Sequence, residues 1–247
     1  MDIRKSIKIF VLFIASPAWV YSQSVDEQVW LEYMGNYPFA NSFNFEGAFT
    51  YNTVLTSPKW TDYGFSATTE LSISQVVEPM AAVALCYTNQ TDSYNTFEVR
   101  PVIGSRFYLT PASRIQVRLL ARFEQRNFKN LTTGEWTQAY RPRIRGELLI
   151  PINQDSYYKD NLWYGIVDAE AIFTTNDVKE RFTNRFRIRT GIGYRLNYSL
   201  RFEFIYMLQE SREAITDQFT STDNIFRFRL KHYLRKSKPS QASGTGN

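Results

Sequence analysis

Apolar and polar side chains alternate with a period of two along most of this chain, and this pattern limits its fold more than any other feature. In residues 114–126, the odd positions from Ile115 to Phe123 are all apolar, whereas the even positions are mostly arginine, glutamine and glutamate. Successive side chains of a β-strand point to opposite faces, so the pattern predicts strands with one apolar and one polar face. A helix does not keep this register.

The same alternation recurs in nine other segments, which together account for most of the chain. It is clear in 97–107, 185–196, 200–209 and 226–235 and weaker in 43–52, 61–74, 79–88, 136–149 and 162–174. A closed sheet leaves no strand edge unpaired, which is what makes a sheet viable in lipid. We therefore expect an all-β fold, namely a closed antiparallel up-and-down transmembrane β-barrel.

The N-terminus has the order of features found in secretory signals. Arg4, Lys5 and Lys8 precede the apolar run 9–15, which is too short to span a membrane as a helix. We expect residues 1–22 to be a cleaved signal peptide, 23–235 the outer-membrane barrel and 236–247 a disordered polar tail. This organisation predicts export to the cell outer membrane.

Composition excludes several other classes of protein. No apolar stretch after residue 22 is long enough for a helical span, and the one cysteine, Cys86, allows no intrachain disulfide. The formal charge of +5 falls to +3 when Asp2, Arg4, Lys5 and Lys8 leave with the signal. Because the basic residues are spread along the chain, nucleic acid is not an expected partner.

The number of strands follows from the links between them. Short links occur at 110–112 and 197–198, and longer polar links occur at 127–135 and 210–222. Outer-membrane barrels have short turns on the periplasmic side and longer loops on the extracellular side, so these two groups of links are expected at opposite ends. The link 151–160 is an exception, because it is long but lies on the short-turn side. With the C-terminus in the periplasm, eleven candidate strands would leave residue 28 outside the cell. We therefore expect ten strands, if 29–37 is not part of the wall, or twelve, if one long segment contains two.

Alternation does not itself say which face meets lipid, and a soluble, exported lipocalin-like barrel that binds an apolar ligand remains the alternative. Its interior would have to hold the aromatic residues of about ten strands, more than such a barrel encloses. Trp30, Trp60, Trp136 and Trp163 each lie near an expected strand start, where a membrane interface favours tryptophan. We therefore expect the apolar face to contact lipid.

Three segments resemble a known family. They are the opening strand at Gln28, Val29 and Trp30, the segment 184–196 with its alternating arginines, and the ending 223–234. They are similar to the domain-of-unknown-function 2490 family over about residues 25–235. The resemblance implies a porin-like outer-membrane barrel of Gram-negative bacteria without an established activity. Unlike many outer-membrane proteins, the chain continues past its last aromatic residue, Tyr233.

The residues offer little for catalysis. The single histidine, His232, shares its face with Phe228 and Leu230, away from any expected pocket. One histidine and one cysteine do not supply a usual metal-ligand set. We expect no enzyme activity, no catalytic or metal-binding residues and no cofactor.

The arginine-rich polar face bears most directly on function. We expect about eighteen basic groups against nine acids on it. The candidate lumen-lining residues are Arg118, Arg122, Arg143, Arg145, Arg187, Arg189, Glu124, Glu147, Asp168 and Glu170. These residues could form a salt-bridge network that fills the lumen, or a passage that attracts small anionic solutes. A third possibility is a scaffold that binds another envelope protein or lipopolysaccharide phosphate.

Overall fold

The computed structural model describes residues 26–39, 42–56, 59–91, 94–111, 113–173, 183–211 and 220–234. Within these residues the chain forms eleven β-strands. They are β1 (Asp26–Pro38), β2 (Phe43–Val54), β3 (Trp60–Leu71), β4 (Val77–Gln90), β5 (Thr96–Tyr108), β6 (Gln116–Asn130), β7 (Trp136–Pro151), β8 (Leu162–Phe173), β9 (Thr183–Arg195), β10 (Leu200–Ser211) and β11 (Thr220–Tyr233). No helix long and apolar enough to cross a membrane occurs in this part of the chain.

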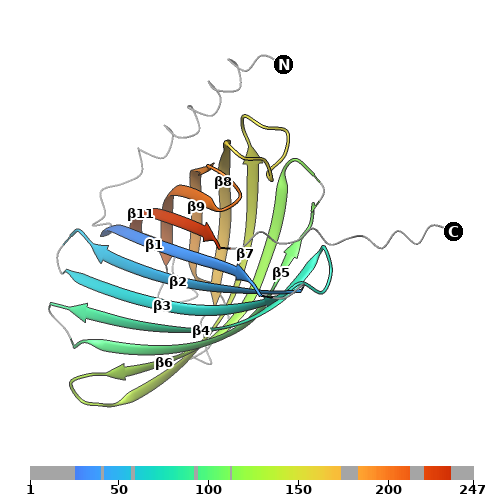
Figure 1. The fold of residues 1–247 in the computed structure, drawn as a ribbon. Helices are drawn as coiled ribbons and strands as arrows, with labels where there is room; N and C mark the ends of the chain where they lie inside the picture. The colour runs from blue at the N-terminus through green and yellow to red at the C-terminus, as the bar shows by residue number, and fades with distance from the viewer. Residues whose placement is uncertain are drawn as a thin grey trace.

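Consecutive strands pair in an antiparallel way, and the sheet closes into a barrel through a parallel pairing of β1 with β11 (Figure 1). The parallel ladder runs from Asp26 opposite Asp223 to Asn36 opposite Tyr233. The expectation of ten or twelve strands is therefore wrong. The expectation placed both ends of the barrel on the periplasmic side, which requires an even number of strands, whereas the parallel closing pair lets an odd number of strands close.

The odd strand number places the start of β1 and the end of β11 at opposite rims of the barrel. We call the rim where β1 begins the N rim and the rim where β11 ends the C rim. The β6–β7 turn, 131–135, lies at the N rim, and the ten-residue β7–β8 link, 152–161, lies at the C rim. The long 152–161 link therefore lies at the same rim as the short 196–199 link, as expected from the sequence.

The two faces of the wall differ as the alternation predicts. Phe49, Ile103 and Phe228 point outward and are exposed on the outer surface, whereas Thr50 and Arg229 from the same strands line the interior. Outward aromatic side chains also meet across strands, such as Phe204 and Phe228, whose ring centroids are 4.9 Å apart. The outer surface is mainly apolar, and most charged side chains of the strands lie inside.

The four tryptophans do not share one environment. Trp136 and Trp163 are exposed, but Trp30 and Trp60 line the interior, so the prediction of a girdle of all four is wrong. The Trp30 indole nitrogen donates a hydrogen bond of 2.9 Å to Gln28, and its ring lies under a guanidinium. Polar partners inside the barrel explain its inward position. The expected signal peptide and polar tail lie outside the described residues.

Candidate functional site

The barrel encloses a cavity of about 2370 Å³ that is lined by residues at both rims. Asp26 and Trp60 border it near the N rim, and Ser74 and Tyr233 border it near the C rim. Strand β8 contributes no lining residue, because its inward side chains, at the even positions of 162–172, are each at most 5% exposed. The lumen is therefore filled against β8 and open elsewhere.

Ion pairs fill the lumen next to the half of β8 that lies toward the N rim. Glu170 binds Arg143 at 2.7 Å and Arg189 at 3.1 Å, and Arg189 also binds Asp168 at 2.5 Å. Arg143 reaches a second carboxylate, Glu124, at 2.9 Å. The arrangement follows from register, since Asp168 lies directly opposite Arg189 in the β8–β9 ladder. Each buried charge has an opposite charge beside it, as burial requires.

A tyrosine cluster fills the lumen at the C rim. Tyr157, from the β7–β8 link, is 2% exposed and packs edge-to-face on Tyr164 with ring centroids 5.1 Å apart. The Tyr164 ring lies over Gly193, where a Cβ atom would collide with it, and its hydroxyl donates to Glu203 at 2.7 Å. Arg201 lies over the Tyr157 ring at 5.2 Å. The unusual length of this link, visible in the sequence, thus reflects a segment that folds into the barrel mouth.

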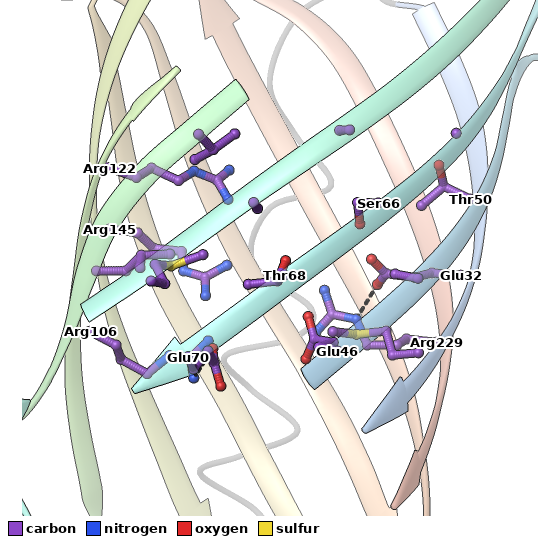
Figure 2. A pocket seen from close by; sticks show the side chains of 18 of the residues that line it. Glu32, Glu46, Thr50, Ser66, Thr68, Glu70, Arg106, Arg122, Arg145 and Arg229 are labelled. Atoms are coloured by element: carbon purple, nitrogen blue, oxygen red, sulfur yellow. Dashed lines mark hydrogen bonds and ion pairs between the residues drawn. The ribbon is translucent and has the colours of Figure 1, made fainter. Parts of the chain in front are cut away.

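The inner face of β2, β3 and β4 is the open side of the lumen. Small side chains project from it into the cavity: Ala48, Thr50, Ser66, Thr68, Ala82 and Ala84, together with Gly64. Because these side chains are short, the space in front of them is not filled by the protein. Figure 2 shows Thr50 and Ser66 facing the cavity from this wall.

Charge is divided between the two sides of the cavity. Strands β1–β4 contribute six lining carboxylates and no lining lysine or arginine, whereas β5–β11 contribute sixteen basic side chains and four carboxylates. Three further carboxylates on β8 and β10 are buried behind the arginines. Among the described residues, sixteen inward bases thus face thirteen inward acids, a smaller excess than the expected eighteen against nine. Residues 26–90 hold a single basic residue, Lys59, a signal that our sequence reasoning missed.

All ten predicted lumen residues lie on the inner face, but they fall into two groups. Asp168 and Glu170 are buried in the ion-pair network, and the other eight also border the cavity. Arg122 and Arg145 keep side-chain exposures of 23% and 19%, compared with 7% for Arg143. Figure 2 shows Arg122 and Arg145 on one side of the cavity, with Glu32 and Glu46 on the other.

The residues considered for catalysis lie apart from one another. His232 points outward, where its Nδ1 lies 3.1 Å from the Tyr33 hydroxyl oxygen, as predicted for the outer face. Cys86 lies on the inner face. The described residues contain no group of three or more histidine, cysteine or carboxylate side chains that could hold a metal ion. The side chains of the lumen therefore interact mainly as ion pairs between carboxylates and basic groups.

Comparison with known families gives a match over residues 27–220 to the family described as "Protein of unknown function (DUF2490)". The chain belongs to this family. The resemblance seen in the sequence is thus confirmed, and the family name carries no activity.

Comparison with curated proteins gives no match. Among solved structures, the chain is similar to the siderophore receptor PirA from Pseudomonas aeruginosa, at 11% identity and a TM-score of 0.31. The match covers 70% of this chain and 33% of the receptor, so this chain spans about a third of that protein.

Proposed function

We propose that this DUF2490 protein is an integral outer-membrane barrel, exported by a cleaved signal in residues 1–22, whose lumen passes small solutes and favours anions. The composition of the outer surface supports the proposal that the barrel is surrounded by lipid. Exposed side chains at mid-strand, including Phe49, Phe65 and Ile103, form an apolar band, as in barrels that face hydrocarbon.

The interior argues against a lipocalin-like barrel. Such a barrel binds apolar ligands in an apolar lumen and presents polar residues to water. Here the cavity is lined by sixteen basic and ten acidic side chains, while the outer face carries the aromatic residues. This distribution of polar and apolar residues is the reverse of that in a lipocalin-like barrel, and it fits a barrel with lipid outside and water inside.

The observation that carries a passage is the cavity that reaches both rims. The inward side chains of β8 are buried behind ion pairs and tyrosines, but the cavity remains open in front of β2–β4, so the salt-bridge network does not occupy the whole lumen. The excess of bases over acids raises the local concentration of small anions. We propose no enzyme activity and no cofactor, because the single histidine points outward and the described residues contain no group of three or more histidine, cysteine or carboxylate side chains that could hold a metal ion.

Planar-bilayer recording on the purified mature chain tests this proposal. A conducting, anion-selective barrel is the expected result, with heat-modifiable migration of the detergent-extracted protein on a gel. A barrel that inserts but does not conduct would overturn the passage and leave a structural role. A chain that is fully soluble without detergent would favour the lipocalin-like alternative.

A further inference from the structure

Two of the arginines that border the open cavity, Arg118 and Arg145, share one carboxylate partner. Arg145 has its ion-pair contact with Glu147 at 4.0 Å, and Arg118 shares the same Glu147 at 3.5 Å. The Nε atoms of both arginines are buried and have no hydrogen-bond partner. One carboxylate therefore serves two guanidinium groups, which leaves positive charge and N–H donors unused on this side of the lumen.

The opposite wall carries a carboxylate that makes no ion pair in the described chain. Glu46 on β2 lies between Asn36 on β1 and Thr68 on β3 in the sheet, and both neighbours are uncharged. In the described chain its carboxylate makes no ion pair, unlike Glu32 and Glu70, which bind arginines at 2.6 and 2.8 Å. Glu46 therefore presents to the cavity a carboxylate that has no ion-pair partner in the described chain.

The barrel holds these two charged groups across the open lumen. β2 and β7 lie on opposite sides of the closed sheet, separated by four strands in one direction and five in the other. Figure 2 shows Glu46 and Arg145 on opposite sides of the cavity. The small side chains Ala48 and Ser66 leave the space between them free. The carboxylate of Glu46 and the guanidinium of Arg145 thus produce an electric field across the passage.

We propose that the lumen binds small zwitterions whose two charges are well separated, such as ω-amino carboxylates. The carboxylate of the solute would meet Arg145 and the neighbouring Arg122, and its ammonium group would meet Glu46. A monovalent anion of the same length gains only the first contact, and its unpaired end faces Glu46. The inference rests on the proposed passage and names the class of solute that it prefers.

Liposome swelling tests this preference with 6-aminohexanoate and hexanoate, which differ in the terminal ammonium group. Vesicles that contain the full mature chain at pH 8 should admit 6-aminohexanoate faster than hexanoate. Glu46→Gln should lower this ratio about threefold to fivefold, the size expected of one partly solvated ion pair. Arg145→Gln should slow both solutes. The matched control Asp26→Asn removes a carboxylate from the same wall at the N rim and should leave the ratio unchanged.

Two outcomes overturn the inference in a conducting barrel. One is a hexanoate rate equal to or above that of 6-aminohexanoate, which would mean a simple anion passage. The other is a ratio that Glu46→Gln does not change. If the wild-type barrel passes neither solute, the proposed passage fails, and calorimetric titration of 6-aminohexanoate into the detergent-solubilised barrel then decides. Heat of binding in the wild-type barrel that is lost in Glu46→Gln would support a binding site. No heat of binding in the wild-type barrel would overturn the inference.

Discussion

Glu32 on β1 and Arg227 on β11 form an ion pair of 2.6 Å across the parallel ladder that closes the barrel. Arg229, two residues further along β11, binds the same carboxylate. Arg229 also binds Glu203 on β10 at 2.9 Å, so the ion pairs continue from the closing seam into the next strand. The one parallel pairing of the described sheet is thus reinforced from inside by side chains.

Removal of the shared carboxylate should weaken this seam. Glu32→Gln leaves Arg227 and Arg229 partly buried with fewer acidic partners, and we expect unfolding to become easier by about 3 kcal/mol. The temperature at which the folded band disappears from a heat-modifiability gel measures the change. Glu27→Gln is the control, because Glu27 is exposed on the outer side of the same strand and its loss should cost under about 0.5 kcal/mol. Equal losses would contradict a role for the seam pair.

The parallel closure predicts an unusual disposition of the chain ends. In a Cys86→Ser background, Glu27→Cys and Thr132→Cys place a thiol at the N rim, and Ser74→Cys and Leu234→Cys place one at the C rim. A membrane-impermeant maleimide applied to intact cells should label one pair and spare the other. A barrel with an even number of strands would group Glu27 with Leu234, and that labelling pattern would refute eleven strands.

Alternation predicts strand positions well because successive side chains of a strand point to opposite faces, and the outer face of this wall is mainly apolar. It located ten of the eleven strands and placed all ten candidate lumen residues on the inner face. With 29–37 it also counted eleven candidate strands, and the expectation of ten or twelve arose only because both ends of the barrel were placed in the periplasm. The parallel pairing of β1 with β11 depends on contacts about 200 residues apart in the chain, which no local pattern records.

Adjacent residues of β2 provide a sharp test of the facing. Phe49 is 59% exposed on the outer wall, and Thr50 lines the cavity. Phe49→Arg should impair insertion by about 2 to 4 kcal/mol, because the charge would lie in hydrocarbon near the midplane. Thr50→Arg should be tolerated. Urea titration of folding into lipid vesicles compares the two variants, and similar penalties would contradict the assignment of faces.

Some inward-pointing apolar residues are buried by other side chains, so we expect them not to tolerate polar substitution. The sequence could not reveal this burial. Ile205 is 2% exposed and belongs to a buried cluster with Tyr164, Leu149 and Tyr157. The β7–β8 link creates this cluster, and the position of a link inside a barrel is set by packing rather than by alternation. The sequence therefore predicts the face of Ile205 but not its burial.

The same cluster predicts an effect on conduction. Tyr157→Ala removes the ring that packs on Tyr164 and that Arg118 and Arg201 cover, so it should lower stability by about 3 kcal/mol and widen the C-rim mouth. Single-channel recording should show a larger conductance. Ile152→Ala is the control, because Ile152 is 45% exposed in the same link and does not border the cavity. Unchanged conductance in Tyr157→Ala would mean that the link does not narrow the passage.

Two arginines of β7 separate the structural and the functional role of the lumen charges. Arg143 is held between Glu124 and Glu170 at 2.9 and 2.7 Å, so Arg143→Gln should cost about 3 to 5 kcal/mol of stability, because it leaves both buried carboxylates underpaired. Arg145 has a single ion-pair contact, at 4.0 Å, and borders the cavity. Arg145→Gln should therefore cost under about 1 kcal/mol and shift the reversal potential toward lower anion selectivity.

Melting and reversal potential measured on the same two proteins decide between a passage and a plug. In a passage, the two effects separate: stability falls in Arg143→Gln and selectivity falls in Arg145→Gln. In a lumen that serves only to hold the barrel together, both variants would lose stability and neither would alter a negligible conductance. Because the two side chains are two residues apart on one strand and point the same way, their difference reports on partners and not on position in the membrane.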